Sequence, residues 1–244
     1  MPSSFEWDEP TFIADGLIAE QKCIFSGYLG NKNADKKKAN EAMEPKHVAL
    51  SLIGEPAMYP KMSALLQEFH RRNMTTFLVT NGTLPRALEK LNPLPTQLYI
   101  SMVAPDEKTY ANVTQQTPEQ TKILWKNYLS SLSFLSTVSS KTRTVLRMTI
   151  ARGLNDNNLE GYAKLIKTGS PHYVEVKSMV FVGWARNSER GLKLEDMLSI
   201  EEIREFAKKL AELSGYIIVD EHIPSRIVLL AKDEKAKENR ILKF

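Results

Sequence analysis

The residues between His47 and Thr83 alternate between hydrophobic and polar positions in a strand pattern, a helix pattern and a second strand pattern. The first run is almost continuously apolar, as in a strand covered on both faces: Val48, Ala49, Leu50, Leu52 and Ile53. Gly54-Glu55-Pro56 ends it, because the residue before a proline avoids helical angles. A stripe at helical spacing follows: Met62, Leu65, Leu66 and Phe69. The stretch from Thr75 to Thr80, closed by Asn81-Gly82, completes a predicted parallel βαβ unit.

The same alternation continues along the rest of the chain. Helices are predicted over residues 10–25 with Asp8 as N-cap, from Lys36, over 84–91, from Thr117, over 159–166 and from Ser199. Thr117 with Gln120 and Ser199 with Glu202 fit the capping-box pattern. Strands are predicted over 97–103, 143–150 and 173–182, then a hairpin over 216–220 and 226–231, and a frayed charged tail from Lys232. Alternating strands and helices predict an α/β fold, a partial (β/α) barrel over residues 1–182 with a small α+β extension over 183–244.

The composition indicates a globular protein but does not indicate which ligand it binds. The chain has 244 residues, 42% of them hydrophobic and 25% charged, which is ordinary for a globular protein. No apolar run approaches the roughly 20 residues of a membrane span, and the first residues lack a secretion signal. One cysteine excludes an intramolecular disulfide and fits a reducing cytoplasm. The net charge of +4 permits a polyanionic partner but does not require one.

Polar residues occur where several predicted strands end, which is where α/β folds bind ligands. The candidates are Ser51, Gly54, Glu55, Thr80, Asn81, Ser101 and Arg147. Two of them have a purely structural alternative. Glu55 would cap the next helix, and Asn81 would be a turn residue with positive φ.

Two further candidates are charges inside otherwise apolar strands. Arg147 interrupts VLRMTI and Lys177 interrupts YVEVKSMV. A charge that faces a barrel interior costs several kcal/mol unless it is paired. Glu175 lies two residues from Lys177 on the same strand face and is the expected partner, either in a structural ion pair or, with Lys177, near a substrate.

Several motifs, in one order, resemble the tRNA 4-demethylwyosine synthase family of radical S-adenosylmethionine (SAM) enzymes in wyosine and wybutosine biosynthesis. They begin at Trp7-Asp8-Glu9-Pro10 and continue through LSLIGEP, TFLVTNGT, LYISM, RMTIARG, YVEVKSMVFVG and PSRIVLL. The resemblance covers nearly the whole chain. It implies a radical SAM barrel in which Gly54 and Glu55 contact the methionine end of SAM, Asn81 and Ser101 face the ribose, and Arg147 binds the carboxylate.

The resemblance also implies an RNA substrate. The loop GWARNSERG combines Arg186 and Arg190 with Trp184, a mixture typical of RNA-contacting loops. Arg226, in the motif EHIPSRIVLL, is the more favoured tRNA contact of that motif, ahead of His222.

The iron–sulfur ligands expected for this family are missing from the sequence. A radical SAM enzyme holds a [4Fe-4S] cluster on a CxxxCxxC loop after its first strand, whereas this chain has only Cys23, so no metal ligands are predicted here. Cys23 is read as a half-buried helical thiol. The expectation is therefore a fragment, a split enzyme whose cysteine-rich segment is a separate chain, or a cluster-free relative. A barrel without its first strand would expose a long apolar edge, which predicts that the chain is poorly behaved alone. Without the cluster-binding segment the chain is expected to be inactive alone.

The activity implied by the resemblance is that of a lyase acting on tRNA-Phe. In the family, a radical made from SAM takes hydrogen from the methyl group of N1-methylguanosine, and condensation with pyruvate builds 4-demethylwyosine. An electron donor, flavodoxin-like or ferredoxin, is implied as a partner. The alternatives are another radical SAM enzyme and a cluster-free tRNA-binding or scaffold subunit.

Overall fold

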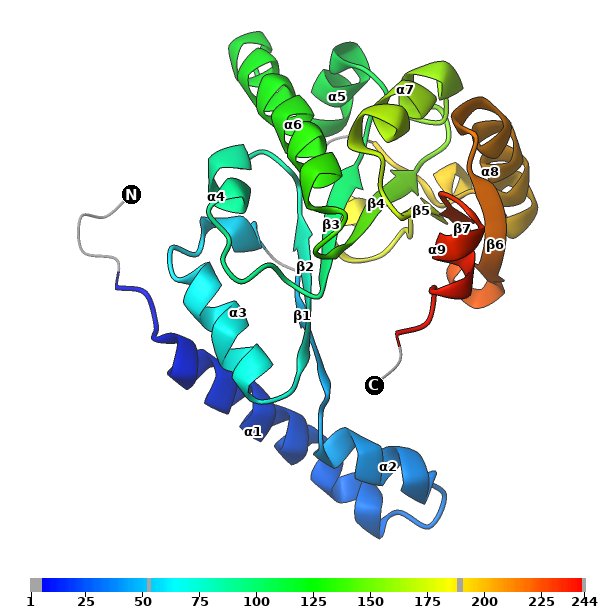
Figure 1. Ribbon diagram of the computed structural model, residues 1–244. Helices are drawn as coiled ribbons and strands as arrows, with labels where there is room; N and C mark the ends of the chain where they lie inside the picture. The colour runs from blue at the N-terminus through cyan, green and yellow to red at the C-terminus, as the bar shows by residue number, and fades with distance from the viewer. Residues whose placement is uncertain (1–5, 52–53, 188–190, 243–244) are drawn as a thin grey trace. The chain divides into compact units, whose positions relative to one another are not determined.

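A computed structural model describes residues 6–51, 54–187 and 191–242, and these residues fall into two compact units (Figure 1). Unit 1 contains residues 1–79 and 86–98, and unit 2 contains residues 80–85 and 99–244. The fold is mixed α/β with mainly parallel strands, as predicted.

Unit 1 is built around the predicted βαβ stretch. Strand β1 (His47–Leu50) pairs in parallel with β2 (Thr75–Thr80), and helix α3 (Met62–Arg71) connects them after the short 3₁₀ helix η1 (Pro56–Met58). The apolar stripe predicted for α3 is confirmed, because Leu65, Leu66 and Phe69 are buried. The remaining helices of this region are α1 (Pro10–Gly30), α2 (Lys36–Met43) and α4 (Pro85–Glu89).

Helix α1 differs from its predicted form at both ends. Glu9, not Asp8, is the N-cap, and its side chain makes no capping hydrogen bond. The helix also runs five residues beyond the predicted end. It is held to α3 by an ion pair between Asp15 and Arg72, whose oxygen and nitrogen are 2.7 Å apart. Arg72 also binds Glu68 of α3, so the contact rests on a small charged network.

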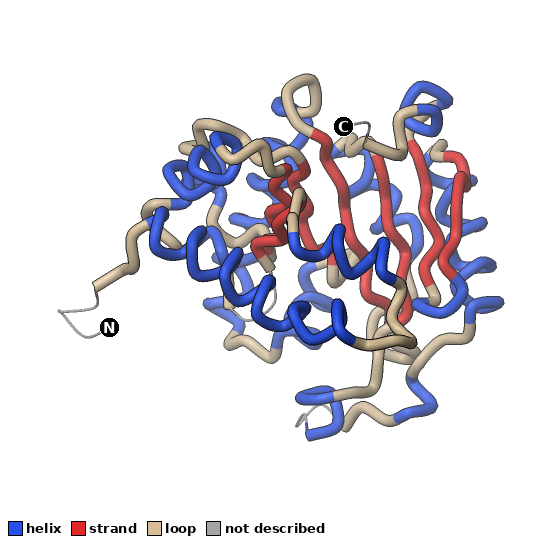
Figure 2. The backbone as a smooth tube through the Cα atoms, turned by 90° about the horizontal axis from the view of Figure 1, so that it is seen from below, coloured by secondary structure: helices blue, strands red, loops and turns tan. Residues whose placement is uncertain are grey.

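Unit 2 carries its strands in the order β3, β4, β5, β7, β6. These strands are β3 (Gln97–Met102, whose first two residues belong to unit 1), β4 (Arg143–Ile150), β5 (Tyr173–Ser178), β7 (Ile227–Ala231) and β6 (Ile217–His222). Strand β5 pairs in parallel with β4 and antiparallel with β7. Figure 2 shows the strands side by side among the helices. The predicted C-terminal hairpin is confirmed, and it continues the sheet beyond β5.

The helices of unit 2 include three that the sequence predicted and two that it missed. Helix α6 (Pro118–Val138) begins at the predicted Thr117 capping box, and α8 (Ile200–Ser214) at the Ser199 box, a device worth about 1 kcal/mol. Helix α7 (Leu159–Gly169) is also close to its predicted span. Helix α5 (Glu107–Thr114) was not predicted.

The C-terminal tail is the clearest error of the sequence-based prediction. Instead of fraying, residues after Lys232 form helix α9 (Glu234–Glu238), whose Ala236 packs with Val145, Tyr173 and Ala231. The Tyr173 hydroxyl donates to the Ala236 carbonyl at 2.6 Å. The helix thus covers one face of the sheet at the amino-terminal ends of β4 and β5.

Candidate functional site

One face of the unit 2 sheet carries four of the predicted site residues. Side chains alternate along each strand, so Tyr99 and Ser101 of β3, Arg147 of β4, and Glu175 and Lys177 of β5 share this face. The opposite face is apolar and fully buried, with Leu98, Ile100, Met102, Leu146, Met148, Ile150, Val174 and Val176. We call the first face, which carries Tyr99, Ser101, Arg147, Glu175 and Lys177, the polar face of unit 2.

Arg147 and Glu175 form an ion pair at the centre of this polar face. The Arg147 Nη2 and Nε donate to Glu175 Oε2 at 3.0 and 3.2 Å. The Arg147 guanidinium also lies over the Tyr99 ring, 5.0 Å from its centroid. The Glu175 side chain is 10% exposed and that of Arg147 is 30% exposed, so the pair is largely withdrawn from solvent. Burial, and then the charge of Glu175, raise the pKa of Tyr99 to about 12.

The expected pairing of Glu175 with Lys177 is wrong. Parallel register sets Arg147 opposite Glu175, whereas residues i and i+2 of one strand are separated along its length. Lys177 is half-buried, opposite Thr149 of β4 and Ile227 of β7. Within the described part of the chain, no ion pair or side-chain hydrogen bond engages its ammonium group. Lys177 is therefore a cation whose charge the neighbouring strands leave uncompensated.

The turn after β2 is held by hydrogen bonds from its own residues. The Thr80 hydroxyl accepts from the Gly82 N–H at 3.0 Å, and the Thr80 side chain is only 1% exposed. The Asn81 Oδ1 accepts from the Thr83 N–H and hydroxyl at 2.9 and 2.6 Å. Gly82, with φ of 73°, is the turn residue with positive φ, so the simpler reading of Asn81 as that residue is wrong.

Two residues of α6 also hold this turn, and they were not identified from the sequence as part of the site. The Ser131 hydroxyl donates to the Gly82 carbonyl at 2.7 Å, and the Asn127 amide donates to the Thr83 carbonyl at 3.0 Å. Both lie on the side of α6 that carries the predicted apolar stripe. Polar residues within that stripe were the signal from which these contacts could have been predicted. These two hydrogen bonds anchor the turn to α6.

The loop after β1 lies in unit 1 and carries three predicted residues. Ser51 is half-buried at the end of β1, and Gly54 has φ of 82°. The Glu55 carboxylate accepts from the Ala57 N–H at 3.0 Å and caps η1, so the capping reading of Glu55 is confirmed. A side chain added at Gly54 would meet no described atom within 4 Å of its Cβ. The backbone is thus open to a ligand at this glycine.

The start of the described chain is clamped beside this loop. Within unit 1 the Trp7 ring packs edge-on against Tyr59, and the Tyr59 hydroxyl donates to the Asp8 carbonyl at 2.7 Å. Lys61 forms an ion pair with Glu9. These contacts join the Trp-Asp-Glu-Pro motif to the residues that follow η1.

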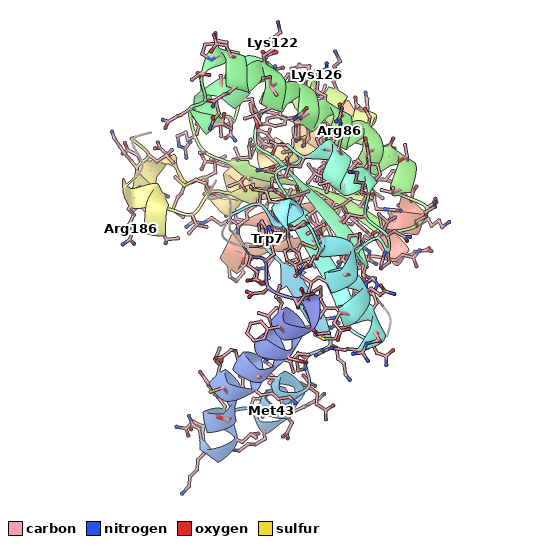
Figure 3. The ribbon with its side chains drawn as sticks, turned by 90° about the vertical axis from the view of Figure 1, so that its left-hand side faces the viewer. Trp7, Met43, Arg86, Lys122, Lys126 and Arg186 are labelled. Carbon is pink, nitrogen blue, oxygen red and sulfur yellow. The ribbon has the colours of Figure 1, made fainter. Side chains whose placement is uncertain are left out.

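The candidate RNA-binding residues lie in unit 2 after β5. Arg186 is exposed on the short helix η2 (Gly183–Asn187), and its Nε donates to the Phe181 carbonyl at 3.1 Å (Figure 3). Arg190 falls outside the described residues. Arg226 ends the 3₁₀ helix η4 (Ile223–Ser225), immediately before β7.

The residues present do not fit an iron–sulfur cluster. The sequence contains one cysteine, Cys23, and it is exposed on α1 rather than half-buried as predicted. Among the described residues, no group of three His, Cys, Asp or Glu side chains is placed to hold a metal ion. Three thiolates for such a cluster cannot come from this sequence. Over the same described residues, no helix is both long enough and apolar enough to cross a membrane.

Comparison with known proteins identifies the family of the chain. Residues 33–166 match the radical SAM superfamily, and residues 168–232 match the family described as wyosine base formation. The S-adenosyl-L-methionine-dependent tRNA 4-demethylwyosine synthase of Pyrococcus abyssi is 46% identical over 93% of this chain and 66% of its own length. The enzyme of that name from Methanocaldococcus jannaschii is 39% identical over 94% of this chain and 70% of its own.

The solved structures agree with this assignment. A structure of TYW1 with a lysine-pyruvate adduct bound is 38% identical, with a TM-score of 0.81 over 94% of this chain and 71% of that one. The chain thus spans about two thirds of the length of its archaeal relatives. On its sequence motifs, its fold and these matches, the chain belongs to the tRNA 4-demethylwyosine synthase family of radical SAM proteins.

Proposed function

We propose that the chain takes part in wyosine base formation in tRNA as the SAM- and RNA-contacting portion of a 4-demethylwyosine synthase. The reaction proposed is the lyase-class condensation of N1-methylguanosine in tRNA-Phe with pyruvate. The observation that carries the proposal is the polar face of unit 2, where Ser101, Arg147 and Lys177 occur on adjacent strands of a radical SAM fold. The named relatives support the same reaction.

SAM presents an ammonium, a carboxylate and a ribose, and the donor set of this chain suits all three. Glu55 would hold the ammonium beside Gly54, where the backbone is open. Arg147 would bind the carboxylate, since Glu175 and Tyr99 already orient its guanidinium. When bound, SAM supplies the radical chemistry of the family.

Other proposed contacts complete the nucleoside side of SAM. Asn81 and Ser101 would bind the ribose hydroxyls, with Ser51 and Thr80 supporting the two loops. Because Thr80 is engaged with Gly82, its contribution would be to the shape of the turn. Asn127 and Ser131 would act through that turn as positioning residues.

The substrate side of the proposal rests on the cations of unit 2. Lys177 would lie near the reacting base and orient an anionic group, while Glu175 would keep Arg147 in place. Arg186, Arg190 and Arg226 would contact tRNA. The barrel would exclude water and so protect a reactive intermediate from side reactions.

The iron–sulfur cluster would be supplied by residues outside this sequence, because one cysteine cannot provide its ligands. A cysteine-rich segment or partner chain and a flavodoxin-like or ferredoxin electron donor are therefore part of the proposal. We expect this chain to be inactive without them. Its single cysteine also favours a second candidate function, a cluster-free tRNA-binding subunit.

The test combines the chain with the part of the Pyrococcus abyssi relative that lies outside the matched region, the proposed source of the cluster cysteines. Each is incubated anaerobically with iron and sulfide, alone and together, and visible absorption, SAM cleavage and modified nucleosides in tRNA are measured. The synthase proposal expects absorption, cleavage and 4-demethylwyosine only in reactions that contain both, and expects Arg147→Ala to abolish the product. If the mixture makes no product and cleaves no SAM while the chain binds tRNA, the second candidate replaces the first.

A further inference from the structure

Arg226 adopts a backbone conformation that an arginine avoids. Its φ and ψ are 51° and 56°, in the left-handed region. For a residue with a Cβ this region costs roughly 1–2 kcal/mol, and glycine or asparagine usually occupies it. Among non-glycine residues of the described chain with positive φ, Arg226 is the only charged one; the others are Asn73, Gln115, Asn158 and Ser170.

The backbone around Arg226 is held in place by two hydrogen bonds. Its N–H donates to the Ile223 carbonyl at 3.0 Å, and its carbonyl accepts from the Ser178 N–H at 3.1 Å. The conformation is therefore imposed by the junction of η4 with the end of β5, where a glycine would fit without strain. A strained residue that the surrounding structure maintains is a reason to look for a function.

This junction brings Arg226 to the same edge of the sheet as Lys177. Lys177 is opposite Ile227 in the antiparallel pairing of β5 with β7, and Arg226 is the residue immediately before Ile227. Both lie at the carboxyl end of β5, the end at which parallel α/β sheets bind ligands. The backbones of two cationic residues almost fifty positions apart in sequence are thus neighbours at this edge.

Three acidic residues of β5 and β6 are already engaged by other cations. Glu175 binds Arg147 at 3.0 Å. On the neighbouring strand β6, Glu221 binds Arg204 at 2.7 Å and Asp220 binds Arg240 at 3.2 Å. Among the described residues, Lys177 and Arg226 have no ion pair at all. Neither cation is therefore neutralised by an ion pair within the described chain.

Exposed apolar side chains adjoin these cations along the chain. Val180 and Val182 follow β5, and Ile223 begins η4; these side chains are 44%, 54% and 54% exposed. Proteins that bind single-stranded RNA combine positive charge with side chains, chiefly aromatic ones, against which unstacked bases pack. The three aliphatic side chains would offer such bases an apolar surface beside the cations. A site for a small carboxylate would need the cations but not the apolar surface.

We propose that Lys177 and Arg226 form a phosphate-binding site for the backbone of a single-stranded RNA loop, and that the left-handed backbone of Arg226 is retained for this purpose. The proposal rests on the proposed function, because it names the part of the RNA that this edge of unit 2 would hold. Each cation would neutralise one phosphate and release counterions when RNA binds.

The test uses the full chain and an unmodified tRNA-Phe transcript, with affinity measured at several salt concentrations. Arg226→Gly removes both the charge and the backbone strain. We expect its melting temperature to stay the same or rise, its affinity for tRNA to fall about five- to tenfold, and its salt slope to fall by about one. Lys177→Met is expected to lower the affinity and the salt slope in the same way.

Two variants serve as controls. Gln115→Gly relieves the same kind of strain, since Gln115 ends α5 at φ of 53°, and should leave tRNA affinity unchanged. Lys126→Met removes an exposed cation from the outer side of α6 and should also leave it unchanged (Figure 3). If the unaltered chain binds tRNA and Arg226→Gly changes neither affinity nor salt slope, this inference is wrong and the proposed function stands. If the unaltered chain binds no tRNA, both are wrong.

Discussion

The Arg147 guanidinium lies 3.0 Å from the Glu175 carboxylate on the adjacent strand and 5.0 Å from the centre of the Tyr99 ring. Side chains of three strands, β3, β4 and β5, are therefore in contact at this one cation. An arginine held by a carboxylate and an aromatic face has few orientations left, and less entropy is lost when it binds an anion. The pair thus serves both the stability of unit 2 and the proposed SAM contact.

Glu175→Gln should destabilise unit 2, because it leaves the Arg147 charge largely withdrawn from solvent without its counterion. We expect the free energy of unfolding to fall by about 2 kcal/mol, less than for a fully buried pair since Arg147 is 30% exposed. Urea denaturation measures the change. Glu221→Gln, which breaks the more exposed pair with Arg204, is the control and should have a smaller effect. Equal losses in the two variants would contradict this account.

Local signals explain why much of the fold was predictable. Strands β2 and β4 match their predicted spans, and α6 and α8 begin at the predicted capping boxes, because periodicity and caps are properties of short segments. Helix α9 was missed for the opposite reason. Its sequence EKAKE has one apolar residue, and only packing of Ala236 under the sheet makes it stable.

The candidate site was predictable in its residue types but not in its pairing. Polar residues at strand ends could be found from periodicity, and Arg147, Glu175 and Lys177 share a face as expected. Which cation binds Glu175 depends on the register between β4 and β5, and a single sequence does not contain that register. The hydrogen bonds of Asn127 and Ser131 to the turn after β2 likewise depend on tertiary packing.

Tyr128 and Tyr162 should respond differently to loss of their hydroxyl groups. Both rings are fully buried, but the Tyr128 hydroxyl has no hydrogen-bond partner among the described residues, whereas that of Tyr162 donates to the Asn155 carbonyl at 2.9 Å. An unsatisfied buried hydroxyl costs about 1–3 kcal/mol, so Tyr128→Phe should be neutral or stabilising. Tyr162→Phe should cost about 1 kcal/mol. Thermal unfolding of the two variants makes the comparison, and a loss of stability in Tyr128→Phe would indicate a partner such as a buried water.

His172 should make the protein less stable below neutral pH. Burial, followed by the charges of Lys232 and Arg143, lowers the pKa of His172 below its usual 6.5. Its Nδ1 accepts from the Thr144 N–H at 3.1 Å, and a proton on that nitrogen would remove the bond. The unfolded chain therefore binds the proton more readily, and stability contributed by neutral His172 is lost as pH falls from about 6.5 through the folded pKa.

Denaturation curves between pH 7.5 and about 5.5 would measure this effect. His172→Gln should reduce the pH dependence in that window. It should not abolish it, because burial also lowers the pKa of His70 and that contribution remains. Glu202 does not confuse the measurement. The Arg152 guanidinium holds the pKa of Glu202 at about 2, so stability that depends on this carboxylate is lost only below pH 4.5. An unchanged slope in His172→Gln would rule out this histidine as the source.

Gly82 and Gly54 have similar backbone angles but different surroundings, and they should tolerate alanine differently. Their φ values are 73° and 82°, so alanine is strained at both by roughly 1–2 kcal/mol. At Gly82 the added Cβ would also lie 3.0 Å from Ile100 Cγ2 and 3.1 Å from the Tyr128 ring, inside the core of unit 2. At Gly54 it would meet no described atom within 4 Å.

Gly82→Ala should therefore cost more stability than Gly54→Ala, by about 1–3 kcal/mol for the overpacked core. The second variant should instead act on ligand binding, because its methyl group would occupy open space beside the backbone at which the SAM contact is proposed. Chemical denaturation and SAM binding, measured on both variants with the cluster-bearing segment present, separate the two effects. A Gly54→Ala variant that binds SAM as the unaltered protein does would remove this loop from the proposed SAM site, whatever its stability.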